Sequence, residues 1–209
     1  MLFRSLNRDA ERFADEGEDF WPKRYAIWGR LVAQQRGQIA WSVIDAKAVG
    51  RFMPPVFAGT RTDSLPALTR AIGLNEDRFA ATLAAYNAAC RPGHFDHTRL
   101  DDCATAGLAP AKSHWALPLD TPPYFAYPLR PGVTFTYLGL KTDADAAVHF
   151  AGRPSANLFV AGEMMAGNVL GQGYTAGVGM SIGTAFGRVA GARAAVVALG
   201  MKGRANAAA

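Results

Sequence analysis

The sequence predicts an α+β protein, and three observations carry this prediction. Short apolar or alternating runs, which are typical of β-strands, occur in both halves of the chain. Two helical patterns follow each other directly in the first half, and one long helical pattern closes the second half. We therefore expect a first part with a small mixed sheet and helices, and a second part with a strand, a hairpin and a long helix.

Composition and charge limit the class of protein. The chain has 209 residues, of which 50% are apolar and 19% charged, and this is typical of a globular protein with a sizeable core. The net charge of +5 is modest and the basic residues are scattered, which argues against nucleic-acid binding. The start is too charged for a secretory signal and no long uncharged apolar run occurs, so we expect a cytoplasmic protein without a membrane span.

The first half contains the elements of a small helix-and-sheet domain. Residues 21–36 place aromatic and aliphatic side chains at helical spacing. Residues 38–45 are rich in β-branched and aromatic residues and predict a strand. Ser64 and Asn75 are suited to cap helix N-termini, and they predict two consecutive helices, the first of which ends at Gly73.

Residues 91–118 are predicted to be irregular and to hold no metal. His94 and His97 are three residues apart, but no acidic residue or cysteine completes a set of ligands. Cys90 and Cys103 match no metal-binding or CxxC spacing, so we interpret them as free thiols.

A proline-rich stretch at residues 119–132 predicts an extended link between two domains. We therefore expect one domain at residues 1–118 and a second at residues 119–209. Beyond the link, residues 133–140 alternate like a strand and residues 147–150 are predicted as the return strand of a hairpin. The short apolar run at 158–161 fits a buried strand.

The last helical pattern follows a glycine-rich loop and ends near Gly200, which is suited to the position just after a helix. Glycines recur every four residues on one helical face, at a cost of roughly 1 kcal/mol each relative to Ala. This cost indicates close backbone approach, either in helix packing alone or at a helix N-terminus that meets an electron-rich cofactor. Arg188 and Arg193 argue against a membrane span. The recurring glycines are Gly179, Gly183, Gly187 and Gly191.

Several segments resemble the FAD-dependent fumarate reductase/succinate dehydrogenase flavoproteins. The run that includes Glu163, with its glycine-rich loop and long helix, resembles the family's C-terminal flavin-binding segment. Residues 134–143, TFTYLGLKTD, resemble the threonine-glycine hairpin that precedes that segment. Residues 12–16 resemble the RF-x-x-E element of the capping domain, and residues 64–90 match its helical return. Within the family the likeness is greatest to the tricarballylate dehydrogenase branch, through LGQGYTAGVGMSIG and RPGVTFTYLGL.

This resemblance implies a partial capping domain at residues 1–118 and the C-terminal part of a Rossmann-like FAD-binding domain at residues 119–209. It implies FAD as cofactor and a small carboxylate as substrate. The family's GxGxxG loop is missing from residues 1–60. The chain is therefore expected to be a portion of a longer enzyme, half of a two-chain enzyme that needs a separate dinucleotide-binding half, or an inactive fragment that acts as an interaction module or self-associates.

The resemblance also implies cofactor-binding residues. Glu163 falls at the position of the family glutamate that binds the ribityl or ribose hydroxyls of FAD, a task suited to a carboxylate acceptor. The amides of Gly177, Val178 and Gly179 are expected to face the pyrimidine edge of the flavin, where charge develops on reduction. Gly173 in the loop completes this predicted set.

The substrate residues depart from the family pattern. Phe135 replaces the family's substrate histidine and Tyr174 replaces its carboxylate-binding arginine, so fumarate and succinate are not expected as substrates. Arg24 is nearest to the cap arginine that moves the proton, with Lys23 and Arg30 as alternatives. The predicted catalytic residues are Arg24, Tyr137 and Tyr174, and the predicted substrate-binding residues are Thr136, Gln172 and Arg130.

Overall fold

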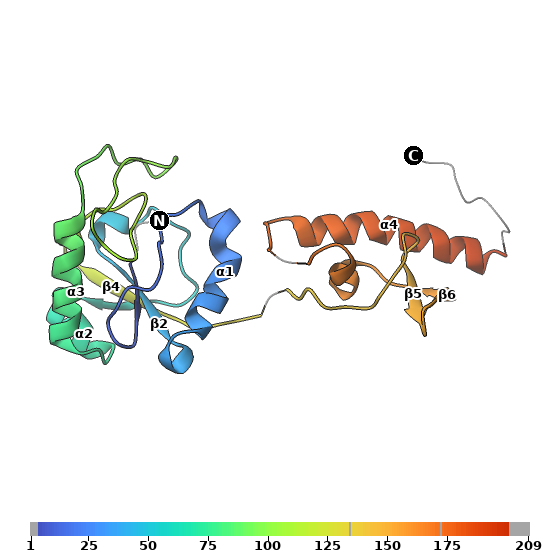
Figure 1. The fold of residues 1–209 in the computed structure, drawn as a ribbon, viewed down its shortest axis with the longest axis horizontal. Coiled ribbons are helices and arrows are strands. Elements are labelled where there is room, and N and C mark those ends of the chain that lie inside the picture. The colour runs from blue at the N-terminus through green and yellow to red at the C-terminus, as the bar shows by residue number, and fades with distance from the viewer. Residues whose placement is uncertain (1–3, 134, 172, 201–209) are drawn as a thin grey trace. The chain divides into compact units, whose positions relative to one another are not determined.

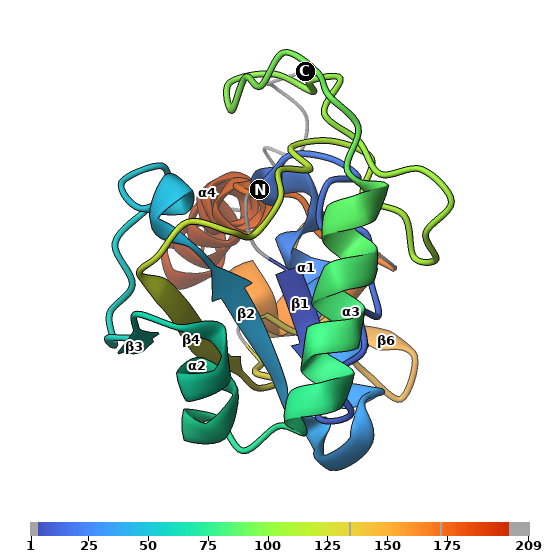
Figure 2. The same ribbon diagram turned by 90° about the vertical axis from the view of Figure 1, so that its left-hand side faces the viewer.

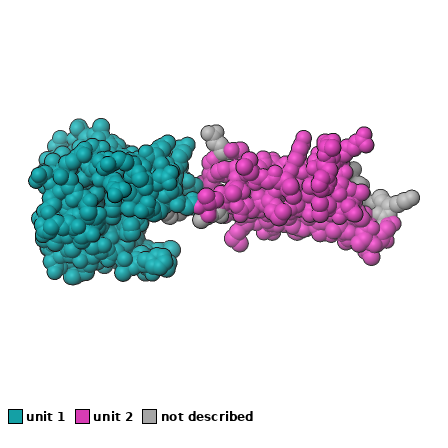
Figure 3. Space-filling model, turned by 90° about the horizontal axis from the view of Figure 1, so that it is seen from below, with its two compact units in different colours: residues 1–132 teal, residues 133–209 magenta. Residues whose placement is uncertain are grey.

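The computed structural model describes residues 4–133, 135–171 and 173–200, and it divides the chain into two compact units, residues 1–132 and 133–209 (Figure 3). Each unit combines helices with a small sheet, so the predicted α+β class is confirmed. All strand pairs among the described elements are antiparallel, where the sequence predicted a mixed sheet.

A four-stranded sheet in the order β1-β2-β4-β3 forms the centre of unit 1 (Figures 1 and 2). Helices α2 and α3 lie on one face of this sheet and helix α1 lies on the other (Figure 1). Because both faces are covered, β2 is buried along most of its length. The elements of the unit are β1 (Arg4–Asn7), α1 (Trp21–Ala33), η1 (Arg36–Gln38), β2 (Ala40–Ile44), η2 (Ala46–Ala48), β3 (Thr60–Thr62), α2 (Leu65–Ala71), α3 (Glu76–Ala89) and β4 (Tyr124–Leu129).

The predicted helix caps are confirmed. The Ser64 hydroxyl accepts a hydrogen bond from the amide of Ala67, and the Asn75 side chain accepts one from the amide of Arg78 at 2.9 Å. Between the two helices Gly73 adopts a positive φ of 70°, which a glycine reaches without strain. The apolar stripes of both helices then meet the sheet, where Leu68, Phe79, Val43 and Ala126 belong to one buried cluster.

Residues 91–118 form no helix or named strand, as predicted, yet they are well anchored. The buried carboxylate of Asp101 accepts hydrogen bonds from the amides of Cys103 at 3.2 Å and Trp115 at 2.7 Å. The Trp115 indole, which is 2% exposed, donates to the carbonyl oxygens of Asp96 and Arg99. These hydrogen bonds pair backbone N–H and C=O groups that have no partner in a helix or sheet.

A buried cluster of charges joins the start of the chain to this irregular segment. Both carboxylate oxygens of Glu16 are in use: Oε1 accepts from the Ser5 amide at 2.6 Å, and Oε2 lies 2.9 Å from Arg12 and 3.6 Å from Lys112. The side chains of Glu16 and Lys112 have no exposed surface and that of Arg12 has 4%. The Arg12 guanidinium also lies over the ring of Tyr86, 5.2 Å from its centroid.

The predicted domain boundary after residue 118 falls inside unit 1, which extends to Gly132. The prolines suggested a linker, but β4 (Tyr124–Leu129) lies between β2 and β3 in the sheet. Pro128 is tolerated in β4 because β3 pairs only with residues 124–126. Toward β3, therefore, the missing N–H of Pro128 does not remove a hydrogen bond of the sheet.

Unit 2 is built from a hairpin, a short helix and one long helix: β5 (Ala147–Phe150), β6 (Arg153–Phe159), η3 (Gly162–Asn168) and α4 (Val178–Ala198). Helix α4 packs on η3 and on β6. Met165, Ala166 and Ile182 form the buried core of this packing. Gly200 follows the helix with φ 62°, as predicted for a glycine at that position.

Two strand predictions in unit 2 were wrong. The described residues of 133–140 form no strand, because Leu140 bonds to η3: its amide donates to the Met164 carbonyl at 2.7 Å, and the Asn168 side chain donates to its carbonyl at 2.8 Å. A side chain on Gly139 would clash with that Met164 oxygen. The hairpin therefore forms between β5 and β6, and β6 begins earlier than predicted and is mostly exposed.

The glycine face of α4 is packed at one end only. A Cβ on Gly179 would lie 2.9 Å from the Phe135 ring, and one on Gly183 would lie 3.9 Å from the backbone of Gly162. A Cβ on Gly187 or Gly191 would have nothing within 4 Å among the described atoms. Packing of the Phe135 side chain thus accounts for Gly179, whereas the contact at Gly183 is an ordinary van der Waals contact.

This difference predicts opposite effects for two alanine substitutions. Gly187→Ala is expected to raise the free energy of unfolding of unit 2 by roughly 1 kcal/mol, because it removes the backbone freedom of a glycine at an open helical position. Gly179→Ala is expected to lower it, because the methyl group meets the Phe135 ring. Urea unfolding followed by far-UV circular dichroism checks both, and shifts in the same direction would contradict the packing.

Candidate functional site

The predicted cofactor-binding carboxylate lies on the first turn of η3, directly after the sheet. Glu163 is exposed, and its Oε1 accepts a hydrogen bond from the Thr136 amide at 2.8 Å. Its Oε2 accepts none from the described residues, so one oxygen is available to a ligand hydroxyl. The predicted residues Glu163 and Thr136 are therefore brought together, with Thr136 using its backbone rather than its side chain.

An aromatic cluster lies at the N-terminus of α4. The ring centroids of Phe135 and Tyr174 are 5.0 Å apart, and those of Phe135 and Tyr137 are 6.3 Å apart. Phe135 and Tyr174 both reach Gly179, since a Cβ there would lie within 3.3 Å of each. The two predicted catalytic tyrosines thus meet through a phenylalanine that also covers part of the first helical turn.

The three predicted backbone amides differ in their surroundings. Gly177 is the N-cap residue of α4 with φ 93°, and apart from its chain neighbours no described atom lies within 4 Å of where its Cβ would be. The Val178 amide already donates to the Thr175 carbonyl at 3.2 Å. At Gly179 a Cβ would meet the Phe135 ring at 2.9 Å. Gly177 is the exposed residue of the three, whereas Val178 and Gly179 are half-buried.

The other predicted residues are dispersed. Arg24 on α1 pairs with Glu18, and Arg130 after β4 donates to the Gly37 carbonyl at 3.1 Å; both belong to unit 1. Gly173 is an exposed loop residue with φ 76°. Gln172 lies outside the described residues.

The described residues hold neither a cluster of metal ligands nor a membrane-spanning helix. No group of three or more histidine, cysteine, aspartate or glutamate side chains in this part of the chain is placed to hold a metal ion. Within the same ranges, no helix is both long and apolar enough to cross a bilayer.

Sequence reasoning missed two contacts that shape the candidate sites. The bond from Thr136 to Glu163 joins residues 27 positions apart, and the pair of Glu18 and Arg24 joins residues six apart across the start of α1. Neither pair lies within a single helix or strand, so no periodic pattern in the sequence signals them.

Known proteins resemble this chain in sequence. A family model described as "FAD binding domain" matches residues 4–182. The "Probable fumarate reductase Ifc3" of Shewanella frigidimarina is 27% identical over 203 residues, which are 93% of this chain and 31% of that protein. The "Digoxin reductase" of Eggerthella lenta is 31% identical over 121 residues, 57% of this chain and 19% of that protein.

Solved structures show the same likeness. The open conformation of a flavocytochrome c3 fumarate reductase has a TM-score of 0.69 at 25% identity, covering 94% of this chain and 33% of that one. The 3-ketosteroid delta1-dehydrogenase of Sterolibacterium denitrificans has a TM-score of 0.64 at 21% identity, covering 92% and 38%, and supports the fold alone.

This chain thus spans about a third of the length of the relatives that match most of it. Its predicted resemblance to the fumarate reductase flavoproteins is confirmed at the level of the family. Because the family model extends over most of the chain, from unit 1 through the first turns of α4, the chain belongs to the FAD binding domain family.

Proposed function

We propose that this chain is a portion of an FAD-dependent oxidoreductase that acts on a CH–CH bond of a carboxylic acid such as tricarballylate. The observation that carries the proposal is the exposed Glu163 carboxylate, with one oxygen available, next to the N-terminal end of α4 in a chain of the FAD binding domain family. FAD supplies hydride transfer to or from a carbon beside the carboxylate.

The described residues fit one end of FAD. The Thr136 amide fixes the Glu163 carboxylate through Oε1, which leaves Oε2 to accept from a ribityl or ribose hydroxyl. The amide of the exposed Gly177 suits the electron-rich edge of a flavin ring. The rings of Phe135 and Tyr174 would have to move aside before a flavin reached Gly179.

The other end of FAD has no counterpart in residues 1–60, which contain no GxGxxG turn. In this proposal the pyrophosphate and adenosine contacts come from a dinucleotide-binding half, in the same polypeptide or in a separate one. The chain by itself is then expected to bind FAD weakly.

The site supplies hydroxyl groups where the family pattern has charged ones. In this proposal Tyr137 and Tyr174 donate hydrogen bonds to a substrate carbonyl or carboxylate oxygen. Arg24, in unit 1, is proposed separately as a cation that transfers a proton. Arg130 retains donors for a carboxylate, since the Gly37 carbonyl uses only its Nη1.

Replacing Glu163 tests the proposal. Glu163→Gln is expected to weaken FAD binding by at least about tenfold, because a hydrogen bond to a charged acceptor contributes roughly 1.5–3 kcal/mol. Titration of FAD followed by flavin fluorescence measures the dissociation constant, with Glu76→Gln in unit 1 as control. Equal affinity of the Glu163 variant and the parent chain, or a nanomolar dissociation constant for the parent, would contradict the proposal.

A second candidate function is that of an interaction module without activity. The observation in its favour is that large apolar side chains of unit 2 are exposed, since exposed apolar patches mark interaction sites. A chain that stays monomeric by light scattering at high concentration would weigh against this alternative. The exposed apolar residues of unit 2 are Val133, Leu138, Leu140, Phe150, Leu158, Met164, Val169, Met180, Val197 and Leu199.

A further inference from the structure

Unit 1 contains a cavity whose lining includes Arg24. It has a volume of about 240 Å³ and lies between the segment of residues 13–19 and helix α1. Since a water molecule takes about 30 Å³ in the liquid, the cavity has room for about eight waters or one small organic molecule. Apolar side chains of Phe13, Ile27, Trp28 and Leu31 line one part of it.

The charged residues of the cavity differ in how far their hydrogen-bonding capacity is used. Asp15 accepts from the amides of Gly17 at 2.7 Å and Ser113 at 3.0 Å. Asp19 accepts from the Phe20 amide at 2.7 Å and pairs with Lys23 at 3.2 Å. The buried Glu16 is bound within its own cluster, as described above. The acidic residues other than Glu18 are therefore already supplied with donors.

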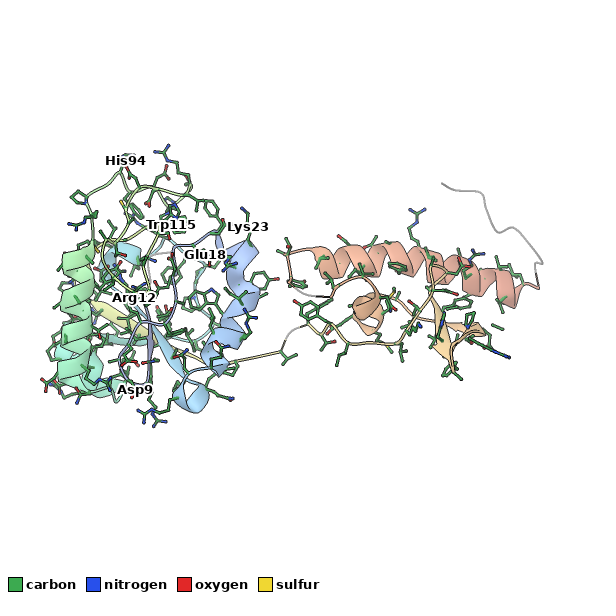
Figure 4. The ribbon with its side chains drawn as sticks, in the orientation of Figure 1. Asp9, Arg12, Glu18, Lys23, His94 and Trp115 are labelled. Carbon is green, nitrogen blue, oxygen red and sulfur yellow. The ribbon has the colours of Figure 1, made fainter. Side chains whose placement is uncertain are left out.

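The cations retain donors. Arg24 bonds through Nη2 to Glu18, which lies beside α1 (Figure 4), whereas Nε of Arg24 is buried and has no partner among the described residues. The Nε and Nη2 edge of a guanidinium matches the two oxygens of one carboxylate, and Glu18 occupies half of that edge. Arg30, a second cation of the cavity, makes no ion pair within the described ranges.

We propose that this cavity binds a small carboxylate with an aliphatic body, and that the carboxylate of Glu18 is an internal stand-in that this ligand displaces from Arg24. The ligand carboxylate takes both Nε and Nη2 of Arg24, and its carbon chain lies on the Trp28 and Ile27 side of the cavity. The proposal deepens the proposed function by assigning carboxylate recognition to unit 1, and rests on it only for the choice of probes.

The surroundings of Glu18 make this exchange feasible. Its side chain is 53% exposed, so the carboxylate loses little when it turns into water. Exposed ion pairs are weak because solvent screens them and both side chains lose freedom. Removing Glu18 also removes the negative charge nearest to the incoming carboxylate, so its loss is expected to strengthen ligand binding rather than weaken it.

Calorimetric titration of the full chain with tricarballylate and succinate tests the proposal. Glu18→Gln is expected to bind these probes about tenfold more tightly than the parent chain, and Arg24→Gln is expected to lose binding. Succinamide, the uncharged analogue, is expected not to bind either protein. The matched control is Glu76→Gln, because Glu76 pairs with Arg70 at the same six-residue separation on the surface outside the cavity.

Three results would overturn the proposal: no binding of either carboxylate to the parent chain and the Glu18 variant, equal affinities of these two proteins, or tighter binding of a diamine such as putrescine to the parent. Circular dichroism verifies folding of each variant, and if Arg24→Gln unfolds, the comparison of Glu18→Gln with Glu76→Gln still decides. The carboxylate titration and the FAD titration test different sites. A negative result in the carboxylate titration does not change the expected FAD binding, and a negative result in the FAD titration does not change the expected carboxylate binding.

Discussion

Replacing Glu16 by glutamine is expected to lower the free energy of unfolding of unit 1 by about 3–5 kcal/mol. The variant keeps the size of the side chain and an acceptor for the Ser5 amide, but it removes the negative charge between Arg12 and Lys112. Both cations are buried, so they lose their counter-charge without gaining water. Breaking a buried ion pair by removing one partner therefore costs more than the pair contributes as a whole.

Urea unfolding measured by circular dichroism gives the change for Glu16→Gln. Glu18→Gln is the matched control, since it removes the same charge two residues later from a pair whose carboxylate is half exposed. This control is expected to change the free energy of unfolding by less than about 1 kcal/mol. Similar effects of the two variants would show that burial of the Glu16 cluster does not matter for stability.

Lys112 gives unit 1 a dependence on pH in the alkaline range. Burial lowers the pKa of its ammonium group from the ordinary value near 10.5 to about 8, and the nearby Arg4 and Arg12 act in the same direction, against Glu16 and Asp15. Between these two values the unfolded chain binds the proton and the folded chain does not. Stability is therefore lowest below about pH 8 and rises with pH through this window.

The contribution of Lys112 to the pH dependence of the free energy of unfolding is obtained by comparison with Lys112→Met, which has no titrating group at this position. The free energy of unfolding of the parent relative to this variant is expected to rise by about 2–3 kcal/mol from about pH 7 to about pH 10, at about 1.4 kcal/mol for each unit of pKa difference. Burial raises the pKa values of the Cys90 and Cys103 thiols, and these groups lower stability as the pH rises. Both proteins contain the two thiols, so their contribution largely cancels in the difference between the parent and Lys112→Met. Parallel pH profiles of the two proteins would contradict the prediction.

Local chemistry made part of the fold predictable. The helices that begin after Ser64 and Asn75 form where predicted, because the side chains of these residues bond to the first free amides of their helices. The end of α4 at Gly200 follows from the freedom of glycine at positive φ. Each of these signals lies within a few residues of the structure it determines.

Strand pairing was less predictable. The alternation in residues 133–140 is compatible with a strand, but Gly139 and Leu140 pack on η3 instead. The prolines of residues 119–132 suggested a linker, but β4 finds its partners 60 and more residues earlier in the chain, in β2 and β3. A strand is specified by its neighbours, and a single sequence does not state which segments will be neighbours.

The sequence by itself determined the helices, their caps and, through the run around Glu163 and its glycine-rich loop, the family. Only the tertiary structure decided how the site residues are used: that Thr136 holds Glu163 through a backbone amide, that Phe135 covers Gly179, and that Glu18 pairs with Arg24 beside a cavity. The physical reason is the separation along the chain of the residues that interact. Caps and glycine conformations depend on neighbours along the chain, whereas hydrogen bonds between distant segments and the burial of a charge depend on how the whole unit packs.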